Sequence, residues 1–125
     1  MVQGVDHVAL AARDPRTLAA WYCETLGMRI LFDNGQDPPT YLVGGDMGGM
    51  IEIMPDRGQP RPEREFYAPG ISHLALRVGD FDTAYAALRG RVRDLADPAP
   101  AAGGGWIANF LDLEGNPVQI VGRPG

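Results

Sequence analysis

The sequence predicts an α+β fold made of two similar βαβββ modules that share one domain. A segment near the N-terminus recurs near the middle of the chain, and each copy begins with an alternating apolar pattern that is followed by a helical one. The chain has 125 residues. Because about 60 residues alone bury too little surface to be stable, the two modules have to fold as parts of one domain.

The repeat relates residues 4–20 to residues 70–86. Seven aligned pairs are identical, namely Gly4/Gly70, His7/His73, Ala9/Ala75, Leu10/Leu76, Asp14/Asp80, Thr17/Thr83 and Ala20/Ala86. The only two histidines of the chain therefore occupy equivalent positions. A duplication of this kind can bring both imidazoles to one point, as a metal ion requires.

The first module, about residues 1–55, is predicted to begin with a strand over 5–12. A helix follows, because Asp14 is a good N-cap before Pro15 and Gly27 is a typical helix stop. Three strands over 28–32, 41–43 and 50–54 complete the module, separated by the turn-forming segments 33–35 and 44–46.

The second module, about residues 70–125, repeats this order after a linker over 56–69 that is rich in proline and charge. A strand is predicted over 71–78 and a helix from the N-cap Asp80 to the residues before Gly90. Strands over 91–95, 106–111 and 118–121 follow, with glycine-rich turns between the last three.

Composition excludes several classes of function. The net charge of -5 gives no basic surface for nucleic acid or an anionic membrane, and no apolar run reaches the roughly 18 residues of a membrane-spanning helix. Without a signal-like N-terminus and with Cys23 as the only cysteine, the protein is expected in the cytoplasm. The chain has no lysine for Schiff-base chemistry, and Ser72 and His73 are expected on opposite faces of one strand, unable to act as a nucleophile and base.

Strand alternation predicts four polar side chains in one phase. His7 alternates with the apolar Val8 and Leu10, and the same reasoning turns Glu52, His73 and Gln119 away from the apolar face. Two imidazoles, a carboxylate and an amide suit Zn, Ni, Co, Mn or Fe(II) and leave room for substrate at the ion. The alternative is that both histidines are ordinary strand-end residues and Glu52 is a surface carboxylate.

These residues resemble the vicinal oxygen chelate superfamily, which includes glyoxalase I, extradiol dioxygenases and bleomycin resistance proteins. The resemblance rests on His7, the helix end over 21–27, Glu52, His73 and the segment 110–119, and it covers nearly the whole chain. It implies that the paired modules form a U-shaped, curled mixed sheet around a central cleft, often in a homodimer. Its metal-ligand positions fall on His7, Glu52, His73 and Gln119.

Gln119 departs from glyoxalase I and the dioxygenases, which usually have Glu there. An amide is not a general base and does not neutralise the ion, so Glu52 is the expected catalytic base. The leading function is lyase or isomerase chemistry on a small substrate that chelates the metal through adjacent oxygens. An Fe(II) extradiol-type dioxygenase and a metal-free, bleomycin-resistance-like binding protein remain open.

Further side chains are candidates for contact with the substrate. Arg77 shares the phase of His73 and could hold an anionic group. The others are expected to line the cavity: Met50, Trp106 and Asn109. Open sheet edges predict a homodimer.

Overall fold

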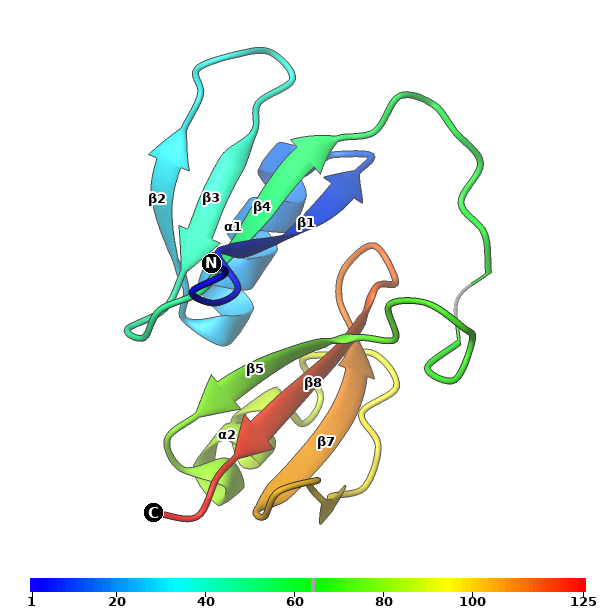
Figure 1. Cartoon of the computed structure of the whole chain (residues 1–125). Coiled ribbons are helices and arrows are strands. Elements are labelled where there is room, and N and C mark those ends of the chain that lie inside the picture. Colours follow the sequence, from blue (N-terminus) through cyan, green and yellow to red (C-terminus); the bar gives the residue numbers. More distant parts are fainter. Residues whose placement is uncertain (64) are drawn as a thin grey trace. The chain divides into compact units, whose positions relative to one another are not determined.

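A computed structural model of the chain describes residues 1–63 and 65–125. The chain forms two compact units, Met1–Arg61 and Pro62–Gly125. Each unit contains one four-stranded mixed sheet and one helix (Figure 1). The predicted α+β class, with two related modules, is confirmed.

The first unit follows the predicted order of elements. It consists of β1 (His7–Ala12), α1 (Pro15–Leu26), β2 (Arg29–Asp33), β3 (Tyr41–Gly44) and β4 (Met50–Pro55). The strands are arranged β1-β4-β3-β2, with β1 and β4 parallel and the other neighbours antiparallel. The edge strand β2 has a register shift between Ile30 and Phe32.

Local sequence signals set both ends of α1. The Asp14 side chain accepts a hydrogen bond from the Thr17 amide, Pro15 occupies the first turn, and Gly27 ends the helix at φ 71°. That left-handed geometry favours glycine, because a Cβ atom would strain it.

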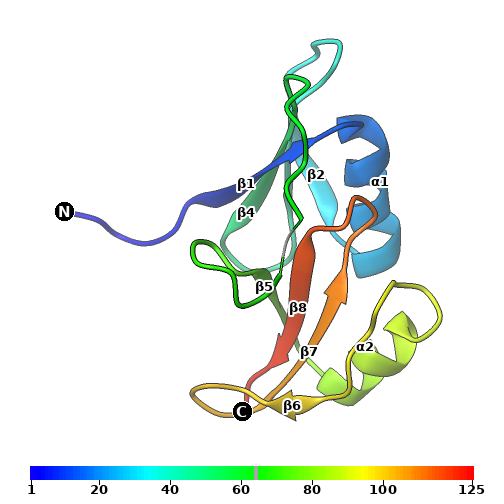
Figure 2. The same ribbon diagram turned by 90° about the vertical axis from the view of Figure 1, so that its right-hand side faces the viewer.

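The helix covers one face of its sheet, as Figure 2 also shows. The apolar core between them consists of Ala12, Leu18, Ala19, Tyr22, Tyr41, Val43, Ile51 and Ile53. Burial of a large apolar side chain such as Ile53 stabilises the fold by about 1.5–3 kcal/mol. The opposite sheet face is therefore left for His7 and Glu52, which alternate with these core positions.

The second unit repeats the topology. It consists of β5 (Leu74–Val78), α2 (Phe81–Leu88), β6 (Ala99–Pro100), β7 (Trp106–Leu111) and β8 (Pro117–Gly122), in the sheet order β5-β8-β7-β6. The helix packs over β7 and β8, where Gly122 gives room to Phe81. Its N-cap is Asp80, which accepts from the Thr83 amide as Asp14 does from Thr17.

The strand predicted over 91–95 is wrong. This segment forms only an isolated bridge between Arg93 and Leu111, and the next strand is the short β6 further on. The segment contacts β7 at two points, through Leu111 N–H to the Arg93 carbonyl and Ala96 N–H to the Asn109 carbonyl. Between them Asp94 has φ 58°, a left-handed conformation that interrupts the extended ladder.

Several predicted strand ends also differ from the structure by one to three residues. The first strand of each unit starts later than predicted, at His7 instead of residue 5 and at Leu74 instead of residue 71. The second helix ends at Leu88, before Gly90 as predicted, because Arg89 is already extended. His73 therefore lies immediately before β5 and not within it.

Candidate metal site

His7 and Glu52 lie on neighbouring parallel strands of the first unit. In the register of β1 and β4, His7 is opposite Met50 and Ala9 is opposite Glu52. Both side chains therefore share the face that α1 leaves uncovered. The charge of Glu52 also contributes to raising the pKa of His7.

Asp6 has a larger effect than Glu52 on the pKa of His7. The Nδ1 atom of His7 lies 2.8 Å from Oδ2 of Asp6, and this hydrogen bond is the main cause of the raised pKa of His7. The Asp6 carbonyl also accepts from the Met50 amide, which ties this residue to the start of β4.

The second unit places His73 and Gln119 in the same relation. Ala75 is opposite Gln119 in the register of β5 and β8, so His73 precedes that pair by two residues, as His7 precedes the Ala9–Glu52 pair. The duplication therefore reproduces the strand pairing that precedes each oxygen donor, although His7 lies within β1 and His73 lies just before β5. Gln119 is more deeply placed than Glu52, with 7% of its surface exposed.

Ser72 and Phe66 both contact the His73 ring. Ser72 Oγ lies 2.8 Å from His73 Nδ1 and donates to the Phe66 carbonyl, while the Phe66 ring lies 5.6 Å from the imidazole, centroid to centroid. The expectation that Ser72 and His73 point apart is thus wrong, because both precede β5 and strand alternation does not apply there. The hydroxyl proton is directed at a carbonyl, so the imidazole does not activate Ser72 as a nucleophile.

The amide of Gln119 is held by its neighbour on β7. Its Nε2 donates to Asn109 Oδ1 over 2.9 Å, and the two residues are direct partners in the register of β7 and β8. With the amino group occupied, Oε1 is the atom of Gln119 suited to a metal.

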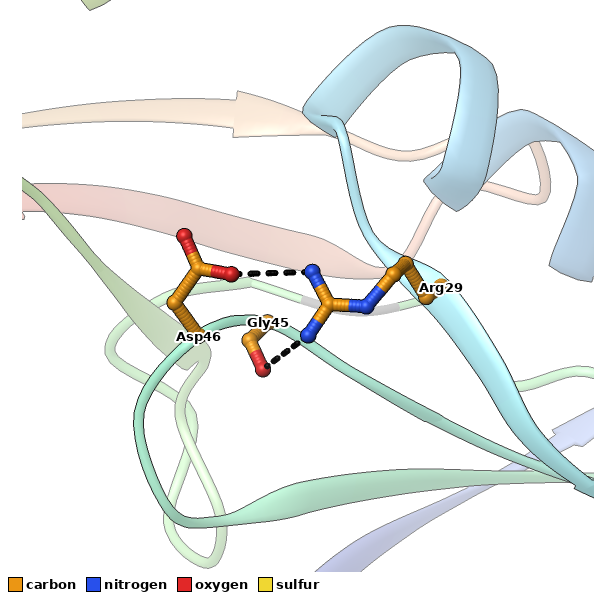
Figure 3. Close-up of polar contacts among 3 residues, drawn as sticks. All are labelled: Arg29, Gly45 and Asp46. Atoms are coloured by element: carbon orange, nitrogen blue, oxygen red, sulfur yellow. Dashed lines mark hydrogen bonds and ion pairs between the residues drawn. The ribbon is translucent and has the colours of Figure 1, made fainter.

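The turn that leads into β4 is held by Arg29 (Figure 3). Its guanidinium donates to Asp46 Oδ1 over 2.9 Å and to the Gly45 carbonyl over 3.2 Å. The adjacent Gly44 lies under Leu31, whose Cδ1 would be 2.7 Å from an added Cβ. These contacts join the start of β2 to the turn between β3 and β4, while the pairing of β4 with β1 and β3 places Glu52 in the sheet.

Apolar side chains accompany the polar pair of the first unit. Met50 and Met54 share the phase of Glu52 on β4, while Leu42 on β3 is opposite Glu52 and Phe32 on β2 is opposite Leu42. Phe32 is 53% exposed. This face can therefore offer an apolar wall beside two polar groups, the usual composition of a small-molecule site.

The predicted substrate residues fall in different places. Met50 is opposite His7, and Asn109 is engaged by Gln119. Arg77 is exposed and shares the phase of Ala75, opposite Gln119. Trp106 is opposite Gly122, on the face that α2 covers, so the sheet does not group it with Gln119.

The nitrogen and oxygen donors of the candidate residues suit a divalent ion, and each unit contributes one pair of them. Among residues 1–63 and 65–125, no three His, Cys, Asp or Glu side chains gather into a metal-binding group. Each unit instead supplies one imidazole together with one oxygen donor, Glu52 or Gln119. Both imidazoles have Nδ1 engaged by a neighbour, the arrangement common among metal-bound histidines.

Sequence reasoning missed the contacts that Asp6, Ser72 and Phe66 make with the candidate ligands. Asp6 and Ser72 each directly precede a repeated histidine, so the paired polar residue at that position was an available signal. Phe66 left no such signal, because its contact with His73 depends on a turn in the linker.

The chain belongs to the glyoxalase/bleomycin resistance protein/dioxygenase superfamily, whose family model matches residues 4–120. No curated protein matches the sequence significantly. In the described part of the chain, neither helix has the length and apolar character needed to cross a membrane.

Solved structures show the same fold at low sequence identity. A glyoxylase/bleomycin resistance protein/dioxygenase domain from Frankia sp. EAN1pec has a TM-score of 0.77 and 22% identity, covering 99% of this chain and 100% of that one. TnmS3, an antibiotic binding protein from Streptomyces sp. CB03234, has a TM-score of 0.72 and 20% identity, with 98% of each chain covered. A lactoylglutathione lyase from Agrobacterium tumefaciens has a TM-score of 0.69 and 15% identity, covering 97% and 94%.

Proposed function

We propose that this protein is a divalent-metal-dependent enzyme with lyase or isomerase activity on a small substrate that chelates the metal through adjacent oxygens. His7, Glu52, His73 and Gln119 are the proposed ligands. The main support is the repeated geometry, in which each histidine precedes by two residues a strand pair that contains an oxygen donor.

The ion, when bound, would act as a Lewis acid on the substrate oxygens. Glu52 is the only carboxylate of the set, so it is the group that takes a proton from the substrate carbon and returns it. The apolar side chains beside it, Met50 and Leu42, would exclude water from that carboxylate. Gln119, whose amide donates to Asn109, would bind the ion but cannot take a proton, because an amide is not a base.

Two other functions are compatible with the family. Two histidines and one carboxylate also form the ligand set of Fe(II) oxygenases, which supports a dioxygenase. The apolar face next to Glu52 and the likeness to TnmS3 support a metal-free protein that binds a drug-like molecule. Metal content separates the binding protein from both enzymes, and oxygen uptake separates the dioxygenase from the lyase.

The deciding experiment is metal analysis of the purified protein and of single variants. We expect one divalent ion per chain, with His7→Ala, His73→Ala and Glu52→Ala each losing most of it while the circular dichroism spectrum is unchanged. Glu63→Ala is the matched control, because this exposed carboxylate lies outside both sheets. Metal that binds equally well to all three ligand variants, or no binding to the wild type after reconstitution, contradicts the proposal.

A further inference from the structure

Three residues next to the proposed ligands form hydrogen bonds with the ligand atoms that would not bind the metal, namely Nδ1 of each histidine and Nε2 of Gln119. We propose that Asp6, Ser72 and Asn109 are positioning residues, which orient His7, His73 and Gln119 so that their ligating atoms are available. This role presupposes the metal site proposed above. It assigns each residue a measurable effect in the protein without metal.

Asp6 determines which nitrogen of His7 carries the proton. A neutral imidazole has one N–H and one lone pair, and a carboxylate can only accept. The 2.8 Å contact between His7 Nδ1 and Asp6 Oδ2 therefore needs the proton on Nδ1. The Nε2 atom then has the lone pair that a metal requires.

Ser72 favours the same tautomer at His73, through two linked hydrogen bonds. Its hydroxyl has one proton, which goes to the Phe66 carbonyl because a carbonyl cannot donate. Ser72 Oγ must then accept from His73 Nδ1 across their 2.8 Å contact. The Phe66 ring beside the imidazole also limits its rotation.

Asn109 plays the corresponding part for Gln119. The hydrogen bond from Gln119 Nε2 to Asn109 Oδ1 distinguishes the two ends of an amide that could otherwise rotate by half a turn. It leaves Oε1, the only end of the amide that can bind a cation. Because Gln119 is buried, a partner for its amino group is needed in any case.

Asp6 and Ser72 are equivalent positions of the repeat but differ in charge. A carboxylate stabilises Nδ1–H more strongly than a hydroxyl does, and it also makes the imidazole a better donor through Nε2. Loss of a group in this position commonly costs about 10- to 100-fold in metal affinity. We expect Asp6→Ala near the upper end of that range and Ser72→Ala near the lower end.

The first test is nitrogen-15 NMR of both imidazoles in the metal-free full-length chain, at alkaline pH where they are neutral. We expect Nδ1–H at His7 and at His73. Asp6→Ala should shift only His7 toward Nε2–H, and Ser72→Ala only His73. The conservative variants Asp6→Asn and Ser72→Thr keep an acceptor and should keep the wild-type tautomer.

The second test is titration of the same proteins with Zn²⁺. Asp6→Ala, Ser72→Ala and Asn109→Ala should bind more weakly, while Ser72→Thr and Asn109→Asp should recover most of the affinity. In Asn109→Asp a carboxylate still accepts from Gln119 Nε2, so Oε1 keeps its orientation. The thermal midpoints of the variants show whether each has folded.

The two tests separate the positioning role from the metal site itself. An Nε2–H tautomer at either histidine of a wild type that binds Zn²⁺ overturns the positioning role and leaves the proposed function standing. The expected tautomers in a wild type that binds no Zn²⁺ overturn the proposed function instead. Equal Zn²⁺ affinity of the alanine variants and the wild type also overturns the positioning role.

Discussion

Among the proposed ligands, Gln119 is the one at which the resemblance to glyoxalase I is expected to break, because an amide stands where a carboxylate is usual. If the chain works by proton abstraction in the glyoxalase manner, Gln119→Glu should raise activity toward the hemithioacetal of glutathione and methylglyoxal. The expected gain is about 100-fold, the lower end of what a positioned general base contributes. Asn109 can turn its amide to donate to the new carboxylate, so the variant should fold. Steady-state kinetics of both proteins measure the effect.

The same substitution has the opposite effect if the natural reaction depends on a more positive ion. An added negative charge then weakens the pull on the substrate oxygens, and natural activity falls. Gln119→Ala is the control, because it removes the oxygen donor without adding charge. Equal turnover of the hemithioacetal by the wild type and Gln119→Glu would show that this position does not separate the chain from glyoxalase I.

Asp112 stabilises the turn between β7 and β8 and is 1% exposed. It accepts from the Glu114 amide, the Asn116 amide and the Asn116 side chain, at 2.8–2.9 Å. Asp112→Ala leaves three half-buried donors without their acceptor, and each costs less than the about 1–3 kcal/mol of a fully buried group because water can reach it. We expect a loss of about 2–4 kcal/mol in chemical unfolding, and a smaller loss for Asp112→Asn, which keeps one oxygen. A change below about 0.5 kcal/mol for the alanine variant contradicts this role.

Both helices begin with the same cap, which predicts a pH dependence. The hydrogen bond from the Thr17 amide is the main reason that the pKa of Asp14 is lowered from 3.8, and Asp80 behaves alike with Thr83. The folded state favours the charged carboxylate, so this stabilisation is complete above the ordinary pKa. It is lost as pH falls through the lowered value.

Asp14→Asn keeps an acceptor for the Thr17 amide but cannot titrate. The stability difference between the wild type and this variant should therefore shrink as the solution is acidified below pH 3.8. Asp14→Ala, which removes the acceptor, should be less stable than Asp14→Asn at neutral pH. Urea unfolding of the three proteins at a series of pH values measures both effects. A difference that does not vary with pH contradicts the charged cap.

The start of β7 depends on close contact with the end of β8. At Gly105, φ is +96° and an added Cβ would lie against the Gly122 carbonyl oxygen. Gly105→Ala should therefore unfold far more easily than Gly103→Ala. Gly103 also has a positive φ, of +84°, but its added Cβ would meet only the Arg123 side chain, at 3.4 Å. We expect the difference between the variants to exceed about 2 kcal/mol, and similar unfolding midpoints would contradict it.

At the scale of the whole molecule we propose a homodimer. Each four-stranded sheet has two edges, and the edge strand β2 exposes Ile30, Leu31 and Phe32. Exposed apolar edges of this kind are usually covered in the assembled protein. Sedimentation velocity at micromolar concentration should show a species of twice the chain mass of 13.5 kDa. A single monomeric species over that range contradicts the proposal.

Much of the fold could be predicted because its signals are local. The caps at Asp14 and Asp80, the stop at Gly27 and the alternation of β4 each depend on a few neighbouring residues, and all appear in the structure. The segment 91–95 could not be predicted correctly. Its apolar and polar residues suit a strand, but the left-handed Asp94 interrupts the ladder, and sequence does not reveal that backbone angle.

By itself, the sequence determined the duplication, the class of fold and the strand phase of His7, Glu52 and Gln119. A period of two follows from the pleat of any strand and needs no knowledge of distant contacts. Only the tertiary structure decided what touches each ligand. Phe66, which lies beside His73 and accepts from Ser72, comes from the linker, and Asn109, the partner of Gln119, comes from β7. Contacts across such separations depend on strand register and on turns that local patterns do not encode.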